Sequence, residues 1–219
     1  MKNNISDILK KKKTIKIILW DFGGVLSTSP LHNFYEYEKK NNIPLGTLIK
    51  INSHNKFNNA WAKLEKNLIN KNEFTKLYLK EANDLNINSK LNVEKILECL
   101  NVELNPEMKN FFLKLKKKIP CACLTNNISE NISHNEKNIF KNFKKNFSHV
   151  FESSKIGLRK PEVEIYKYVL NKLSIPAKNI LFIDDLGINL KPARMLGMNT
   201  YKMENTKSLI IFLQKLLEL

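Results

Sequence analysis

The chain contains one aspartate where an enzyme could use it as a nucleophile. Asp21 ends an apolar, largely β-branched stretch and is followed, after one residue, by Gly23 and Gly24. A carboxylate that attacks phosphorus forms an aspartyl-phosphate and divides a difficult hydrolysis into two easier displacements. An apolar stretch before D-x-G-G also fits a purely structural turn, so the rest of the chain must supply the other groups.

Besides a nucleophile, phosphoryl transfer needs a divalent cation and fixed donors for the phosphoryl oxygens. Asp184 and Asp185 offer the hard oxygen ligands that Mg2+ prefers, and Asp21 can share the ion. Thr125, through its hydroxyl, and Asn126, through its amide and backbone N–H, would hold the phosphoryl oxygens.

Lys160 would place a positive charge between Asp21 and the phosphoryl group. Each of these residues also has a structural interpretation, because a strand-terminal aspartate can cap the next helix and a lysine is usually a surface charge. Two adjacent carboxylates repel each other, however, and a bound cation relieves that repulsion. We therefore favour a metal site at Asp184 and Asp185.

Alternating strands and helices are predicted to position these groups. The run from Ile15 to Trp20 is typical of a buried parallel strand, and ligands of open α/β sheets bind beyond the carboxyl ends of such strands. A helix over 30–40, with Ser29 as its N-cap, comes next. Further strands are predicted at 119–124, 149–152, 179–183 and 200–203. The alternation predicts an α/β fold with a Rossmann-like parallel sheet, in which three strand ends meet at one mouth.

The stretch from residue 43 to about 105 has a different character, because its apolar residues recur at helical spacing. We predict a helical cap at 30–105, inserted into a core formed by 1–29 and 106–219. A polar, Asn-rich helical segment is expected after Asn127.

Composition limits the class of protein. The 219 residues carry a formal net charge of +16, and 42% are hydrophobic, which is enough for a buried core. No apolar run approaches the roughly 18 residues of a membrane span. The N-terminus does not resemble a secretory signal, so we expect a cytoplasmic protein. Because the lysines are scattered, we expect no nucleic-acid partner. Cys121 and Cys123 are expected to fill a strand face.

Four segments resemble, in order, the motifs of the haloacid dehalogenase (HAD) superfamily. They are DFGGVL at 21–26, LTNN at 124–127, SSKIGLRKPEVEIY at 153–166 and ILFIDDLGINLKPARMLGM at 180–198. The last two are similar to the N-terminal phosphatase domain of soluble epoxide hydrolase and to a bacterial glucose-1-phosphate phosphatase. The resemblance is weakest across the cap.

The resemblance implies a role for each matching residue. Asp21 matches the family nucleophile, which also binds the metal, and Asp185 matches the main metal ligand with Asp184 in support. The backbone carbonyl of Gly23 matches a further ligand, and Asn189 occupies a position that often helps hold the site together. Mg2+ is the implied cofactor.

In the second and third motifs, Thr125 matches the phosphate-binding residue, Asn126 its neighbour and Lys160 the family lysine. The resemblance therefore implies a Mg2+-dependent phosphatase that hydrolyses a small phosphorylated metabolite through an aspartyl-phosphate.

Gly23 departs from the family pattern, because a second aspartate that acts as general acid and base usually stands there. Such assistance typically contributes about 10²–10⁴-fold to the rate. A leaving group of low pKa, such as the anomeric oxygen of a sugar phosphate, would tolerate the loss. His32 or Glu36 could replace the acid. Alternatively, turnover is weak or lost and the chain is a binding module.

Dehalogenation is a further alternative, since dehalogenases of this superfamily also lack the second aspartate. They use no metal and lack paired acids in the fourth motif, so Asp184 and Asp185 favour the phosphatase. The oligomeric state is not indicated by the sequence.

Overall fold

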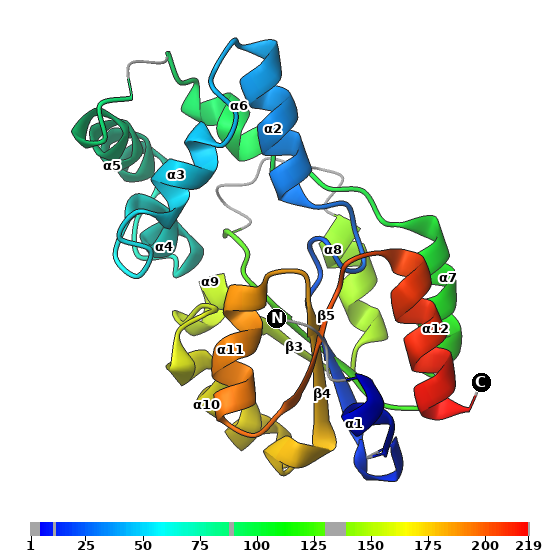
Figure 1. Ribbon diagram of the computed structural model, residues 1–219. Helices are drawn as coiled ribbons and strands as arrows, with labels where there is room; N and C mark the ends of the chain where they lie inside the picture. Colours follow the sequence, from blue (N-terminus) through cyan, green and yellow to red (C-terminus); the bar gives the residue numbers. More distant parts are fainter. Residues whose placement is uncertain (1–4, 11, 88–89, 130–138, 219) are drawn as a thin grey trace.

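A parallel five-stranded sheet lies at the centre of the computed structural model, which describes residues 5–10, 12–87, 90–129 and 139–218 (Figure 1). The strands are β1 (Ile17–Trp20), β2 (Cys121–Thr125), β3 (His149–Glu152), β4 (Ile180–Asp184) and β5 (Asn199–Lys202). Their order is β3-β2-β1-β4-β5, and every neighbouring pair is parallel. The predicted α/β fold with a Rossmann-like sheet is therefore confirmed, with β1 as its central strand.

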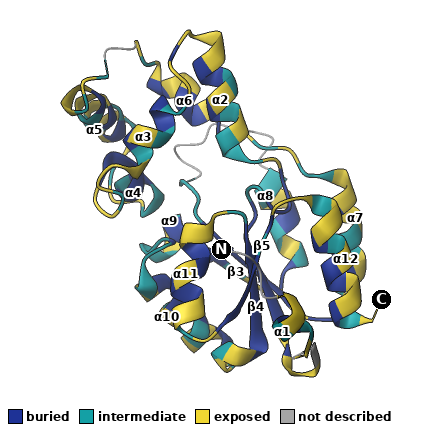
Figure 2. Cartoon of the chain, in the orientation of Figure 1, coloured by how far each residue is buried: buried dark blue, intermediate teal, exposed yellow. Residues whose placement is uncertain are grey.

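Helices cover both faces of this sheet. One face carries α1 (Ile5–Lys10), α7 (Pro106–Leu115), α8 (Ile139–Phe143) and α12 (Thr206–Leu217). The other carries α10 (Val163–Leu173) and α11 (Gly187–Met195). Successive side chains of a strand point to opposite faces, so Ile18 and Trp20 pack into the first core, while Ile17 and Leu19 pack into the second. Figure 2 shows the strands buried between these two layers.

Short elements complete the core. Helix α9 (Ser153–Ile156) follows β3 directly, and 3-10 helices occupy Lys12–Thr14, Lys144–Asn146 and Ala177–Asn179.

Five helices form a separate cluster at the top of Figure 1. They are α2 (Pro30–Lys40), α3 (Thr47–Ser53), α4 (Ala60–Glu65), α5 (Lys71–Asp84) and α6 (Val93–Glu98). Their buried side chains make a hydrophobic core of their own, centred on aromatic contacts of Trp61 with Phe34, Phe74 and Tyr78. We call this cluster the helical unit.

Two chain segments connect the helical unit to the sheet, and they pair with each other. The N–H of Thr28 donates to the carbonyl of Glu103 at 2.8 Å, and the N–H of Asn105 donates to the carbonyl of Leu26 at 3.0 Å. Ser27 and Leu104 form an antiparallel bridge between these bonds. The helical unit is thus held close to the chain that leaves β1.

Several local predictions are tested by these elements. The helix over 30–40 is confirmed, and the Ser29 side chain accepts a hydrogen bond from the Leu31 N–H. The strand predicted at 119–124 begins later, at Cys121, because Pro120 has no N–H to pair. Cys121 and Cys123 are buried in β2, as expected.

Most of the Asn-rich segment after Asn127 lies outside the described residues. Over the described part of the chain, every helix is too short or too polar to cross a membrane.

Candidate active site

Three strand ends bring Asp21, Thr125 and Asp184 to one edge of the sheet. Asp21 directly follows β1, while Thr125 and Asp184 are the last residues of β2 and β4. Because β1 lies between β2 and β4, these ends are neighbours in space. The N–H of Asp21 also donates to the carbonyl of Ile183 at 2.8 Å, which ties the nucleophile candidate to β4.

The ammonium group of Lys160 lies between two of the carboxylates. Its Nζ is 2.8 Å from Oδ2 of Asp21 and 2.7 Å from Oδ2 of Asp184, and the side chain is only 1% exposed. Burial acts to lower the pKa of Lys160, but the carboxylates of Asp184 and Asp21 outweigh it and raise that pKa. The amine is therefore protonated at neutral pH and carries a charge into the site.

Asp184 is completely buried and surrounded by donors from the protein. Besides Lys160, its oxygens accept from the Asn189 amide at 3.0 and 3.1 Å and from the Leu186 N–H at 2.8 Å. Asn189 is fixed in turn, because its carbonyl accepts from the Tyr166 hydroxyl at 2.7 Å. The role implied for Asn189, that of holding the site together, agrees with these contacts.

Asp185 differs from its neighbour, because it is partly exposed and lies against the backbone of Gly24. A Cβ on Gly24 would lie 2.2 Å from Oδ2 of Asp185, and the φ of Gly24 is +72°, so only glycine fits. Asp21, Asp184 and Asp185 each offer an oxygen, and these three oxygens lie within 4.8 Å of one another. A cluster of hard oxygen donors of this kind fits a divalent cation such as Mg2+.

Asp21 and Asp185 hold their protons more tightly than usual, because their pKa values are raised. Burial, reinforced by Asp184, raises the pKa of Asp185 to about 6. Burial also raises the pKa of Asp21 well above its usual range, although Lys160 acts in the opposite direction. These pKa values describe the metal-free protein, and a bound cation would favour the ionised carboxylates.

Asn126 makes contacts that the sequence did not predict. Its side-chain Oδ1 accepts from the Lys160 N–H at 2.9 Å, while its Nδ2 donates to the Lys160 carbonyl at 2.9 Å and to Oε2 of Glu65 at 3.0 Å. Both amide protons are therefore used, and this side chain could bind a phosphoryl oxygen only by losing one of these bonds. Its predicted role in binding phosphoryl oxygens stays a prediction, and in this structure the amide of Asn126 holds the Lys160 backbone. The neighbouring Thr125 is buried at the same strand end.

A family model described as "Hydrolase: haloacid dehalogenase-like hydrolase" matches residues 15–197. The chain belongs to this family. It is a HAD-like hydrolase, and the family resemblance of its four motifs is thereby confirmed.

Two curated relatives are much longer proteins. This HAD-like chain is 28% identical over 210 residues to acyl-CoA dehydrogenase family member 10 of Mus musculus, covering 94% of this chain and 19% of the relative. It is 44% identical over 66 residues to bifunctional epoxide hydrolase 2 of Rattus norvegicus, covering 30% of this chain and 12% of the relative. The chain thus spans less than a fifth of either relative.

Two solved structures share the fold. A HAD family enzyme of Bacteroides thetaiotaomicron, solved with magnesium and inorganic phosphate, is 26% identical, covers 89% of this chain and 98% of its own, and gives a TM-score of 0.59. The L-2-haloacid dehalogenase RSc1362 is 15% identical, covers 91% of this chain and 99% of its own, and gives a TM-score of 0.63. The second likeness is one of fold alone.

A cavity of about 150 Å³ opens beside the strand ends of this HAD-like core. Its lining combines residues of the core and of the helical unit, including Gly23, Thr125, Asn126 and Glu65. Much of the remaining lining is apolar, from Phe22, Leu100, Val102, Ile128, Ile139 and Phe140. Phe22 and Gly23, the two residues that follow Asp21, thus line the cavity.

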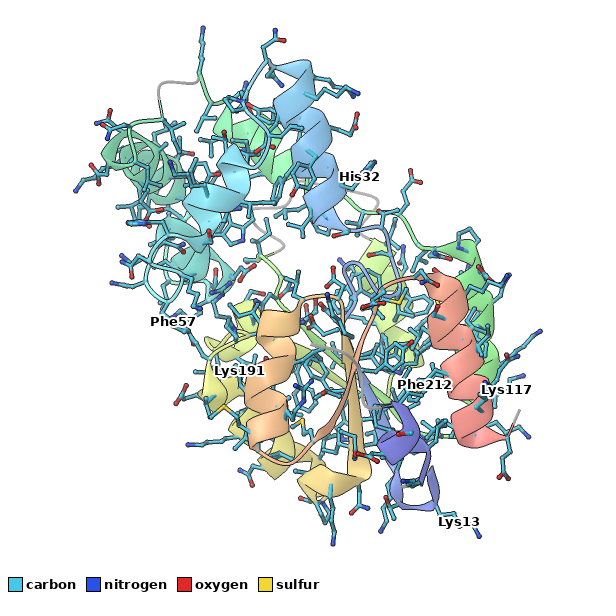
Figure 3. The ribbon with its side chains drawn as sticks, viewed as in Figure 1. Lys13, His32, Phe57, Lys117, Lys191 and Phe212 are labelled. Carbon is cyan, nitrogen blue, oxygen red and sulfur yellow. The ribbon has the colours of Figure 1, made fainter. Side chains whose placement is uncertain are left out.

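His32 and Glu36, named above as substitutes for the missing acid, do not line this cavity. His32 is exposed, on the side of α2 that faces away from α4 and α5 (Figure 3). The carboxylate that the helical unit does contribute is Glu65, at the end of α4. Sequence reasoning missed Glu65 because it is one of many charged residues at helical spacing.

Proposed function

We propose that this HAD-like hydrolase is a Mg2+-dependent phosphatase that acts in the cytoplasm on a small phosphorylated metabolite. The observation that carries the proposal is the cluster of Asp21, Asp184 and Asp185 beside the Lys160 ammonium. Such a cluster suits a cation and a phosphoryl group together. Magnesium and inorganic phosphate in the related enzyme of Bacteroides thetaiotaomicron support the same interpretation.

In this proposal Asp21, Asp185 and the backbone carbonyl of Gly23 hold the metal, while Asp184 fixes Lys160 and supports Asp185. Bound Mg2+ would neutralise charge on the phosphoryl group during transfer. Lys160 stays protonated between its two carboxylates and adds a fixed positive charge. Thr125 supplies a hydroxyl at the end of β2 for a phosphoryl oxygen.

The reaction proceeds in two displacements at phosphorus. A carboxylate oxygen of Asp21 attacks, the bond from phosphorus to the ester oxygen breaks, and the leaving group departs with the bonding electrons. Water then attacks the phosphorus of the aspartyl-phosphate, which releases inorganic phosphate and a proton and restores the Asp21 carboxylate. With glycine at position 23, no side chain at that position activates this water, so the second displacement is expected to be slow.

Residues 30–105 would form the cap of this enzyme, with the core at 1–29 and 106–219. In this proposal the cap joins the core at the two connecting segments, which are hydrogen-bonded to each other at Thr28 and Glu103. The cavity of about 150 Å³ lies between cap and core residues, so a small leaving group is expected, and closure over it would exclude bulk water. One candidate substrate is a sugar phosphate whose leaving group, the anomeric oxygen, has a low pKa.

Gly23 makes a direct test possible. A Cβ at this position would meet only Pro30, with its nearest atom 3.5 Å away, which is an ordinary contact. We expect Gly23→Asp to fold and to accelerate hydrolysis of alkyl phosphates by roughly 10²-fold or more, because it restores a general acid and base. Rates on substrates with good leaving groups should change far less. Slower hydrolysis of both substrate classes would argue against a missing acid.

The experiment that tests the function is a panel of phosphorylated metabolites assayed for phosphate release with Mg2+ and with EDTA. The proposal predicts Mg2+-dependent release, which Asp21→Asn abolishes. Release of halide from 2-haloacids that EDTA leaves unchanged would identify a dehalogenase instead. No release from any ester or haloacid, with phosphate still bound, would identify the binding module.

A further inference from the structure

One carboxylate of the helical unit reaches the core next to Lys160. Oε2 of Glu65, in α4, accepts from Nε of Arg159 at 2.5 Å and from Nδ2 of Asn126 at 3.0 Å. Its Oε1 accepts from Nε1 of Trp61 at 3.1 Å. The Glu65 and Arg159 side chains are each only 12% exposed, so solvent competes weakly for these bonds.

The same contacts continue to the ammonium group of the site. The Asn126 amide hydrogen-bonds to both the N–H and the carbonyl of Lys160 at 2.9 Å, as the backbone of a paired β-strand would. Lys160 then extends its Nζ to 2.8 Å from Asp21. Hydrogen bonds thus connect α4 through Asn126 to the backbone of Lys160, and the side chain of Lys160 ends in the ion pair with Asp21.

We propose that Glu65 is a positioning residue that fixes Lys160 through Asn126 when the helical unit sits on the core. The catalytic consequence rests on the proposed function, whereas the positioning itself does not. Glu65 accepts three hydrogen bonds from the protein, one of them from a guanidinium. Its effect is exerted through the backbone of Lys160.

A second ion pair, between the C-cap residue of α4 and the N-cap residue of α10, provides a matched control. Nζ of Lys66 lies 2.9 Å from Oε1 of Glu162, and the two side chains are 17% and 14% exposed, close to the values for Glu65 and Arg159. In the described part of the chain, neither Lys66 nor Glu162 makes a hydrogen bond with Asn126. Loss of this ion pair should weaken the contact between the helical unit and the core without disturbing the hydrogen bonds of Asn126.

The first experiment measures hydrogen exchange of the Lys160 amide by NMR, without substrate or metal, in Glu65→Leu and in Lys66→Met. Because Asn126 is the acceptor of this N–H, we expect exchange to accelerate by roughly tenfold in Glu65→Leu and to stay within about twofold of the wild type in Lys66→Met. Equal rates in the two variants would overturn the proposal. Melting temperatures of both variants show whether either has lost its fold.

The second experiment is a double-mutant cycle on kcat. Glu65→Leu is expected to lower kcat about tenfold, since small misplacements of a catalytic group are costly. Combined with Asn126→Ala, it should add little to the loss caused by Asn126→Ala alone. For Lys66→Met combined with Asn126→Ala, the fold-losses in kcat of the two single variants should instead multiply. Multiplied losses for Glu65→Leu and Asn126→Ala would refute action through Asn126.

The two experiments separate the failure of this inference from that of the proposed function. If the wild type hydrolyses no ester, the phosphatase proposal fails, and the exchange rate of the Lys160 amide still decides the positioning role. If esters are hydrolysed and Glu65→Leu leaves both exchange and kcat unchanged, the phosphatase stands and the positioning role is refuted.

Discussion

Replacing Asp185 by asparagine should stabilise the metal-free protein. Burial, together with Asp184, raises the pKa of Asp185 from an ordinary value of 3.8 to about 6. Each tenfold change in proton affinity corresponds to about 1.4 kcal/mol, so ionised Asp185 destabilises the fold by about 3 kcal/mol at pH 8. Asparagine has nearly the same shape and no charge, and it removes this penalty.

The sign of the pH dependence follows from the raised pKa. Above pH 6 the aspartate is ionised in the folded and unfolded states, and the penalty is present in full. Between pH 6 and about 3.8 the folded protein takes up a proton that the unfolded chain does not, and the penalty disappears. The advantage of Asp185→Asn should therefore be full at pH 8 and nearly absent at pH 4.

Urea unfolding in EDTA at pH 8 and pH 4 measures this difference. For a chain of this size, about 3 kcal/mol corresponds to a melting temperature roughly 6–12 °C higher. Added Mg2+ should stabilise the wild type in proportion to the logarithm of its concentration and should have a much smaller effect on the variant. A variant less stable than the wild type in EDTA at pH 8, or equally stabilised by Mg2+, would refute the assignment of Asp185.

Three further predictions concern single side chains. Lys160→Met leaves two buried carboxylates without their ammonium partner and should lower the free energy of unfolding by about 3–5 kcal/mol in urea titrations. Gly24→Ala would displace the Asp185 carboxylate and should weaken Mg2+ binding at least tenfold by calorimetry, whereas Gly23→Ala, with an ordinary contact only, should not. Glu38→Ala orphans two N–H groups at the start of α3, bonded now at 2.6 and 2.7 Å, and should lower the free energy of unfolding by about 3 kcal/mol, measured likewise in urea.

The strand ends of the site could be predicted because two strong signals coincide there. The strands before Asp21 and after Asn179 are continuous apolar runs, buried on both faces, and each stops at an aspartate. Parallel pairing then forces these carboxylates to the same edge of the sheet. The family motifs add the residue types, so the approximate place of Asp21 and Asp184 follows from the sequence.

The contacts around Lys160 could not be predicted in the same way. Glu65 and Arg159 are 94 residues apart, and neither periodicity nor spacing marks them in a chain with 37 basic and 21 acidic residues. The use of the Asn126 amide was also hidden, because asparagine after a strand fits a turn, a phosphoryl contact or a backbone clamp equally well. Long-range polar pairing depends on how the helical unit sits on the core, which is information that local patterns lack.

The net charge of the chain is a poor guide to the charge of its site. The chain carries +16, yet the described site combines three carboxylates with one ammonium and so is negative when all four groups are ionised. A phosphate monoester is itself anionic and would be repelled by such a site. A divalent cation cancels the two excess negative charges, and an anionic substrate can then approach the Asp21 carboxylate. In the proposed phosphatase, the metal would therefore be needed for substrate approach as well as for the chemical step, and raising Mg2+ should lower the KM for an anionic ester.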